Sequence, residues 1–140
     1  MVNSMKGAAA YGKGAKAYAR VGVESSVMSA TPHQLITMLF DGAQMSIRTA
    51  RIHMLDGNYA EKGKAISKAL DIVNNGLQAA LDAEKGGEVA DRLWSLYDYI
   101  ARLLLEANLR NDPERLDEAS KLLENIGSAW REIGSRSDGV

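Results

Sequence analysis

The sequence predicts an all-α fold, an antiparallel up-down four-helix bundle that follows a mobile N-terminal arm. Three observations lead to this prediction. The 140 residues include two prolines, and long stretches lack the β-branched runs that favour strands. Four segments carry apolar residues at steps of three and four, the period of an amphipathic helix. Start and stop signals separate these segments, and such short connections make consecutive helices antiparallel.

The first helix has the clearest start signal. Thr31 is a predicted N-cap, Pro32 suits the first helical position, and Gln34 completes a capping box. Gly57 is expected to end the helix in the left-handed conformation. Between these signals, the residues expected to face inward are Leu35, Leu39, Ala43, Ile47, Ala50 and Met54.

The second helix is expected to begin at Asn58, with Glu61 at the capping-box position. The pair Gly86-Gly87 is expected to end it and to form the turn that follows. Its predicted inward stripe is Ile66, Leu70, Val73, Leu77 and Leu81.

The third helix is predicted over residues 88–110, and Asp112-Pro113 marks the start of the fourth. The inward stripe of the third is Val89, Leu93, Leu96, Ile100, Leu104 and Ala107. That of the fourth is Leu116, Ala119, Leu123, Ile126, Trp130 and Ile133.

These elements divide the chain into three parts. Residues 1–28, rich in Gly, Ala, Ser and Lys, are expected to form a flexible arm. Residues 29–134 form the predicted bundle, and 135–140 a disordered tail.

The composition argues against several classes of function. Seventeen basic residues balance eighteen acidic ones, which disfavours nucleic acid as the partner. No Glu precedes either of the two histidines by three residues, so a bundle metal site is not expected. With no cysteine and no nucleophile elbow, we expect neither an enzyme nor a cofactor. No apolar run is long enough for membrane insertion, and no signal peptide is apparent, so the expected location is the cytoplasm.

Two helices carry more apolar surface than one buried face requires. The apolar arc of the third helix covers roughly 200°, against roughly 100° for a single buried stripe. Beside its core stripe lies a second set, the Trp94 row: Trp94, Ala101 and Leu105. The first helix carries the Met38 row: Met38, Met45 and Ile52. These rows could be contacts within the bundle, because each bundle helix touches two neighbours. Otherwise they form a groove for a partner or a homodimer face.

Several motifs resemble the flagellin export chaperone family, FliS. The similarity begins at Val23-Glu24-Ser25 and Ser29-Ala30-Thr31-Pro32, and continues through LITMLFDGA at 35–43. It includes LYDYI at 96–100, LLEANLRND at 104–112 and Ala129-Trp130, and it covers residues 15–133 in one register. The family's usual tyrosine before Asp-Gly is Phe40 here, so a hydrogen bond from a hydroxyl at this position is lost.

The resemblance implies a cytoplasmic chaperone that binds newly made flagellin. Members hold the disordered C-terminal segment of flagellin, which folds into helices along the chaperone. This prevents premature polymerisation and keeps flagellin competent for flagellar type III secretion. The complex docks at the export gate protein FlhA, some members also bind the anti-sigma factor FlgM, and the N-terminal arm can cover the groove until the client displaces it.

The apolar rows and the family resemblance together predict a set of partner-binding residues. Tyr18 is the expected anchor of the arm, and Asn108 either binds the client backbone or cross-links the bundle. The other predicted contacts are Met38, Phe40, Met45, Ile52, Trp94, Tyr97, Ala101, Leu104, Leu105 and Ala107. The alternative function is a structural bundle that self-associates through the same rows, as a homodimer, without a flagellin client.

Overall fold

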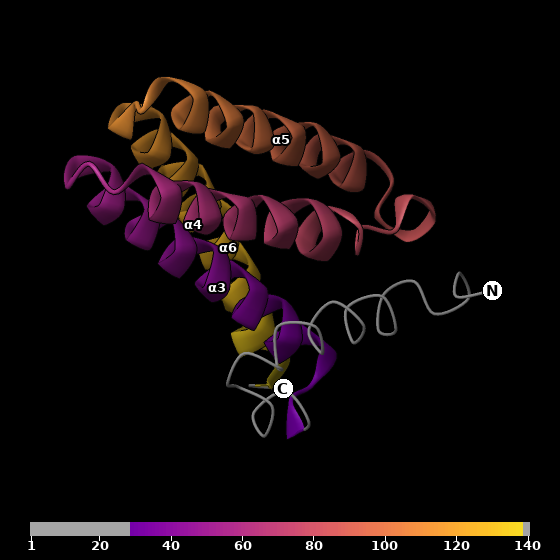
Figure 1. Cartoon of the computed structure of the whole chain (residues 1–140). Helices are drawn as coiled ribbons and strands as arrows, with labels where there is room; N and C mark the ends of the chain where they lie inside the picture. The colour runs from indigo at the N-terminus through magenta and orange to yellow at the C-terminus, as the bar shows by residue number, and fades with distance from the viewer. Residues whose placement is uncertain (1–28, 139–140) are drawn as a thin grey trace.

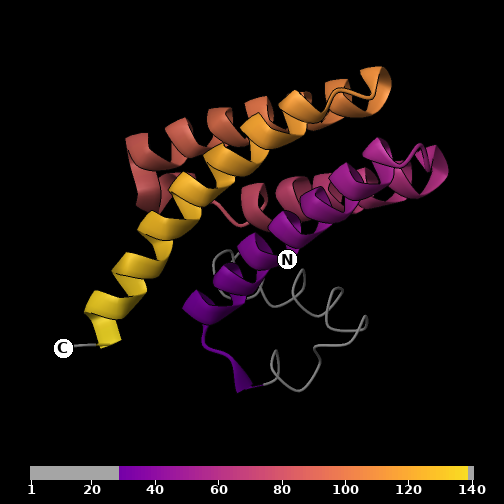
Figure 2. The same cartoon turned by 90° about the vertical axis from the view of Figure 1, so that its left-hand side faces the viewer.

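A computed structural model describes residues 29–138 as a bundle of four long helices (Figures 1 and 2). The elements in order are α3 (Pro32–Leu55), α4 (Tyr59–Asp71) with its π-helical continuation η2 (Ile72–Gln78), α5 (Ala83–Arg110) and α6 (Pro113–Asp138). α3 packs against α4 and α6, and α5 packs against α6 and the α4–η2 helix. The predicted all-α bundle is therefore confirmed. The predicted arm, including Tyr18, lies outside the described residues.

The predicted caps of α3 and α6 are confirmed. The Thr31 hydroxyl accepts from the Gln34 backbone N–H at 3.1 Å, and the Gln34 side chain accepts from the Thr31 N–H at 2.8 Å. Gly57 follows the end of α3 with a φ of 78°, a conformation that glycine adopts without steric cost. At the start of α6, Asp112 Oδ1 accepts from the Glu114 N–H at 3.0 Å.

The second helix differs from the prediction at both ends. Asn58 makes no side-chain capping bond. The helix ends at Gln78, well before Gly86, because Asp82 caps a new helix by accepting from the backbone N–H groups of Glu84 and Lys85. Gly87, with φ 52° and ψ −127°, therefore forms a kink inside α5 and not the connection between helices.

The six residues predicted to face inward from α3 are all buried. On α5 the prediction was wrong by one position in the first turns, because Val89 is 62% exposed whereas Ala90 and Tyr97 are buried. The largest fully buried side chains of the bundle are Ile66, Ile72, Val73, Ile100, Leu104, Leu116 and Leu123.

The four helices are not uniformly close. α3 and α6 run inclined to α4 and α5, and the two pairs diverge from the end that holds the α3–α4 and α5–α6 connections (Figures 1 and 2). α6 continues to Asp138, beyond the boundary at 134 that the sequence predicts. Within the described part of the chain, no helix combines the length and the apolar character that crossing a membrane demands.

Candidate functional site: an apolar groove and two exposed rows

An apolar groove of about 370 Å³ lies at the diverging end of the bundle. It forms where α3 and α5 begin and where η2 and α6 end, so all four helices contribute to its wall. Its lining is almost entirely apolar: Ile36, Phe40, Leu77, Leu81, Val89, Leu93, Tyr97, Asn125, Ile126, Ala129, Trp130 and Ile133. Such a surface suits an apolar side-chain face of a partner better than a polar small molecule.

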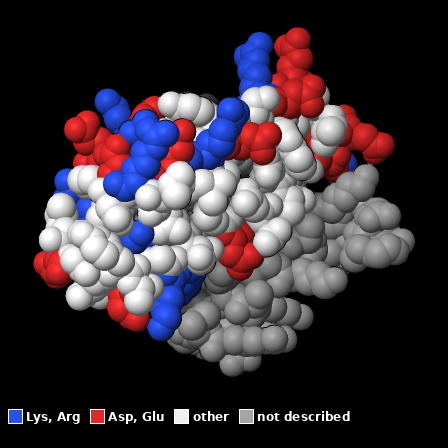
Figure 3. All heavy atoms as spheres, turned by 45° about the horizontal axis from the view of Figure 1, so that its top comes forward, with Lys and Arg blue, Asp and Glu red and all other residues white. Residues whose placement is uncertain are grey.

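Both predicted rows reach the surface. Met45 and Ile52 of the Met38 row are 63% and 61% exposed, and Met38 is partly buried. In the Trp94 row, Trp94 and Leu105 are 50% and 55% exposed, with Ala101 partly buried between them. Figure 3 shows one face of the molecule on which uncharged side chains form a broad band between clusters of charge. The bundle therefore leaves much of both rows uncovered by its own helices.

Four of the predicted contacts are buried instead. Leu104 and Ala107 are fully buried in the core. Phe40 and Tyr97 are 2% and 3% exposed, and both line the groove. In this structure, a partner could contact Phe40 and Tyr97 only through the groove. It could not contact Leu104 or Ala107.

Asn108 links two helices of the bundle. Its backbone oxygen and its Oδ1 accept hydrogen bonds from Lys62 Nζ at 2.9 and 2.7 Å. The Lys62 ammonium also lies 5.7 Å from the centre of the Tyr59 ring, and Lys62 is 5% exposed. This geometry favours the cross-linking role of Asn108 over contact with a client backbone.

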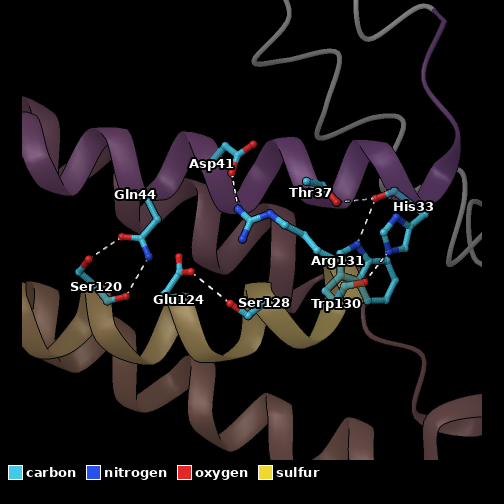
Figure 4. Close-up of polar contacts among 9 residues, drawn as sticks. All are labelled: His33, Thr37, Asp41, Gln44, Ser120, Glu124, Ser128, Trp130 and Arg131. Carbon is cyan, nitrogen blue, oxygen red and sulfur yellow. Dashed lines mark hydrogen bonds and ion pairs between the residues drawn. The ribbon is translucent and has the colours of Figure 1, made fainter. Parts of the chain in front are cut away.

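Polar contacts join α3 to α6 at several points between His33 and Gln44 on the α3 side (Figure 4). Gln44 and Ser120 exchange two hydrogen bonds, of 2.8 and 2.6 Å. At the groove end, the rings of His33 and Trp130 stack with centroids 4.5 Å apart. These contacts hold together the two helices, α3 and α6, that form one part of the groove wall.

Charged groups lie mainly on the outside of the helices. The Tyr99 hydroxyl donates to Glu118 at 2.6 Å across α5 and α6, and this hydrogen bond is the main cause that raises the pKa of Tyr99 above its ordinary value. Among the described residues, no three His, Asp or Glu side chains are grouped so that they could hold a metal ion. The chemistry that the site offers is thus apolar contact.

The spacing of apolar residues does not reveal the groove. It predicts Trp130, Ile126 and Leu93 in core stripes, whereas the structure leaves each partly exposed on the groove wall. One signal could have indicated the groove: aromatic and branched residues are concentrated near the ends of several stripes. In an up-down bundle, these ends meet at the same end of the molecule.

Comparisons with known proteins agree on one family. The family model described as flagellar protein FliS matches residues 14–137. The chain is 55% identical over 124 residues to the flagellar secretion chaperone FliS of Salmonella typhimurium, covering 89% of this chain and 92% of that protein. It is 48% identical over 120 residues to the protein of the same name from Escherichia coli, covering 86% and 88%.

A more distant relative aligns over much the same length. The flagellar secretion chaperone FliS of Bacillus subtilis is 28% identical over 109 residues, which covers 78% of this chain and 80% of that protein. The resemblance stated from the motifs is therefore confirmed, and this chain belongs to the family of the flagellar protein FliS.

Proposed function

We propose that this protein is a cytoplasmic flagellar export chaperone that binds the disordered C-terminal segment of flagellin. It thereby prevents premature polymerisation and keeps flagellin competent for type III secretion. The observation that carries the proposal is the apolar surface outside the core, which comprises the groove and the exposed parts of the Met38 and Trp94 rows. The names of the relatives supply the process, flagellar secretion.

The arrangement of this surface favours a disordered client over a folded one. The Met38 row lies on α3 and the Trp94 row on α5, helices that occupy diagonal corners of the bundle. One rigid helix cannot cover both rows, whereas a flexible chain can form one helix on each. Because such a client loses conformational entropy when it folds on the chaperone, it needs a large apolar contact area to offset that loss.

A substitution in the groove tests the proposal, because Ala129 lines the groove and is exposed. Ala129→Glu places a charge on the groove wall without burying it in the core. We expect at least a tenfold loss of affinity for a labelled flagellin C-terminal peptide, measured by fluorescence anisotropy. The reason is that the introduced carboxylate would lose its water when the apolar face of a bound helix covers it.

The matched control is Ala60→Glu, the same substitution at an exposed position of α4 that is not part of the groove wall. It should leave the affinity within about twofold of wild type. Equal affinities for both variants, or no binding of the peptide by the wild-type protein, would contradict the proposal.

Docking of the loaded complex at FlhA, and binding of FlgM, are further parts of the proposal that rest on the family resemblance. The alternative is a bundle that self-associates as a homodimer through the Met38 and Trp94 rows. Sedimentation velocity at dilute concentration separates the two. A monomer supports the chaperone, and a tight dimer that Met45→Asp dissociates supports the alternative, because Met45 is the central and most exposed member of its row.

A further inference from the structure

His33 and Trp130 form a clasp between the start of α3 and the last turns of α6 (Figure 4). Their rings stack with an interplanar angle of 10°. Two hydrogen bonds cross between the same residues: Trp130 Nε1 donates to the His33 backbone oxygen at 3.1 Å, and His33 Nε2 lies 2.6 Å from the Trp130 backbone oxygen. Because a carbonyl oxygen can only accept, His33 Nε2 carries a proton in this arrangement.

Gly134, one helical turn beyond Trp130, completes the clasp. Gly134 is buried, and a Cβ atom built on it would overlap the His33 ring. Glycine is unfavourable inside a helix compared with alanine, so its presence in α6 indicates a packing requirement. The His33 ring thus occupies space that the absence of a side chain at 134 leaves free.

The clasp also borders the apolar groove. Trp130 lines the groove together with Ala129 and Ile133 of the same helix. In this part of α6, the ion pair between Arg131 and Asp41 joins side chains that are 40% and 60% exposed, and such exposed pairs contribute little. The stacked and hydrogen-bonded clasp is a partly buried polar link that joins this stretch of the groove wall to α3.

We propose that His33 is a positioning residue for the apolar groove. It holds the Trp130 ring in one orientation as part of the groove wall, and so sets the affinity of the groove for an apolar occupant. That the natural occupant is a helix of the flagellin segment rests on the proposed function. The effect of His33 on the groove does not, since any apolar probe of the groove reports it.

Trp130 emission is measured in the full chain with Trp94→Phe, which leaves Trp130 as the sole indole of the two in the sequence. Both affinities are measured with Trp94 in place, because Trp94 belongs to a proposed binding row. His33→Ala removes the imidazole ring and its N–H donor. Gly134→Ala keeps His33 in the sequence but forces its ring out of the position next to Trp130. We expect both variants to shift Trp130 emission to longer wavelength. We also expect both to weaken binding of anilinonaphthalenesulfonate, an apolar dye, and of the flagellin peptide by about tenfold, the loss typical of an anchoring side chain.

Two further variants separate positioning from general destabilisation. His33→Gln keeps an N–H donor at the reach of Nε2 and should restore part of both affinities. Gly63→Ala is the matched control for Gly134→Ala, because a Cβ at Gly63 meets only Asn108 Oδ1, at an ordinary 3.9 Å. It should leave Trp130 emission and both affinities unchanged.

The outcomes distinguish this inference from the proposed function. Unchanged Trp130 emission or unchanged dye affinity in His33→Ala overturns the positioning role, whatever the peptide does. Dye binding that responds to His33 while the wild-type protein fails to bind the peptide supports the positioning role and contradicts the flagellin client.

Discussion

On α5, two adjacent leucines have opposite environments. Leu104 is fully buried in the core, whereas Leu105 is 55% exposed in the Trp94 row. We predict that Leu105→Asp lowers the affinity for the flagellin peptide about tenfold or more, because a carboxylate at the interface must be desolvated. Helix content by circular dichroism and the midpoint of thermal unfolding should remain close to wild type.

Leu104→Asp is the comparison variant for that experiment. It places the same carboxylate in the core, where the effective cost is several kcal/mol, so the bundle should lose its cooperative unfolding transition. If Leu105→Asp unfolds the protein as Leu104→Asp does, Leu105 belongs to the core and the Trp94 row is not a binding surface.

A second prediction at the residue scale concerns Lys62 and Asn108. Because Lys62 is nearly buried, and Asn108→Ala removes the Oδ1 that accepts from its ammonium while the backbone acceptor stays, this substitution should lower the free energy of unfolding by about 2 kcal/mol. Lys62→Met keeps the aliphatic volume and removes the charge, so it should be close to neutral. Urea denaturation gives both values.

The double variant decides whether the two residues act as a pair. In the Lys62→Met background, Asn108→Ala should cost much less than it does alone, because no ammonium is present to lose its Oδ1 acceptor. An undiminished loss would mean that Asn108 stabilises the bundle independently of Lys62.

At the scale of elements, the two predicted N-caps at Thr31 and Asn58 behave differently. Thr31 forms both bonds of a capping box at the start of α3, whereas Asn58 makes no side-chain bond at the start of α4. Thr31→Ala should therefore lower the free energy of unfolding by about 1 kcal/mol, and Asn58→Ala should have a much smaller effect. Urea denaturation of the two variants, side by side, tests the difference; equal losses would contradict this assignment of the caps.

The sequence predicts α3 well, because local signals define this helix. The cap at Thr31, the left-handed Gly57 and the regular spacing on α3 depend on neighbours within a few residues, and all three appear as expected. The π-helix η2 carries no such local signal. Its last residue, Gln78, is buried and donates to the Trp94 backbone oxygen and to Asp98 Oδ1 on α5, contacts that exist only after the helices pack.

The candidate site was predictable only in part, for a related reason. Periodicity identifies Met45 and Leu105 as apolar residues off the core stripe, and both are exposed. It cannot give the divergence between the helix pairs, so it places Trp130 in the core and does not reveal the groove. Phe40 was assigned by resemblance, and the structure places it on the groove wall with its side chain almost fully buried.

At the scale of the whole molecule, the diagonal positions of α3 and α5 bear on how the client binds. If one flexible segment contacts both rows, binding of one half to its row holds the other half close to the second row. The second half then binds at a high effective concentration. We predict that either half of the flagellin segment alone binds at least tenfold more weakly than the intact segment. Titration calorimetry with the three peptides measures this, and a half that binds as tightly as the whole would place the client on one row.

The central claim is that the apolar surface outside the core binds and folds a disordered flagellin segment. Its most direct test is the far-ultraviolet circular dichroism of the protein mixed with the flagellin C-terminal peptide, compared with the sum of the separate spectra. The account predicts a gain in helix signal that saturates at one peptide per chain and is lost in Ala129→Glu. A mixture whose spectrum equals the sum, at concentrations where the peptide is in excess, would contradict it.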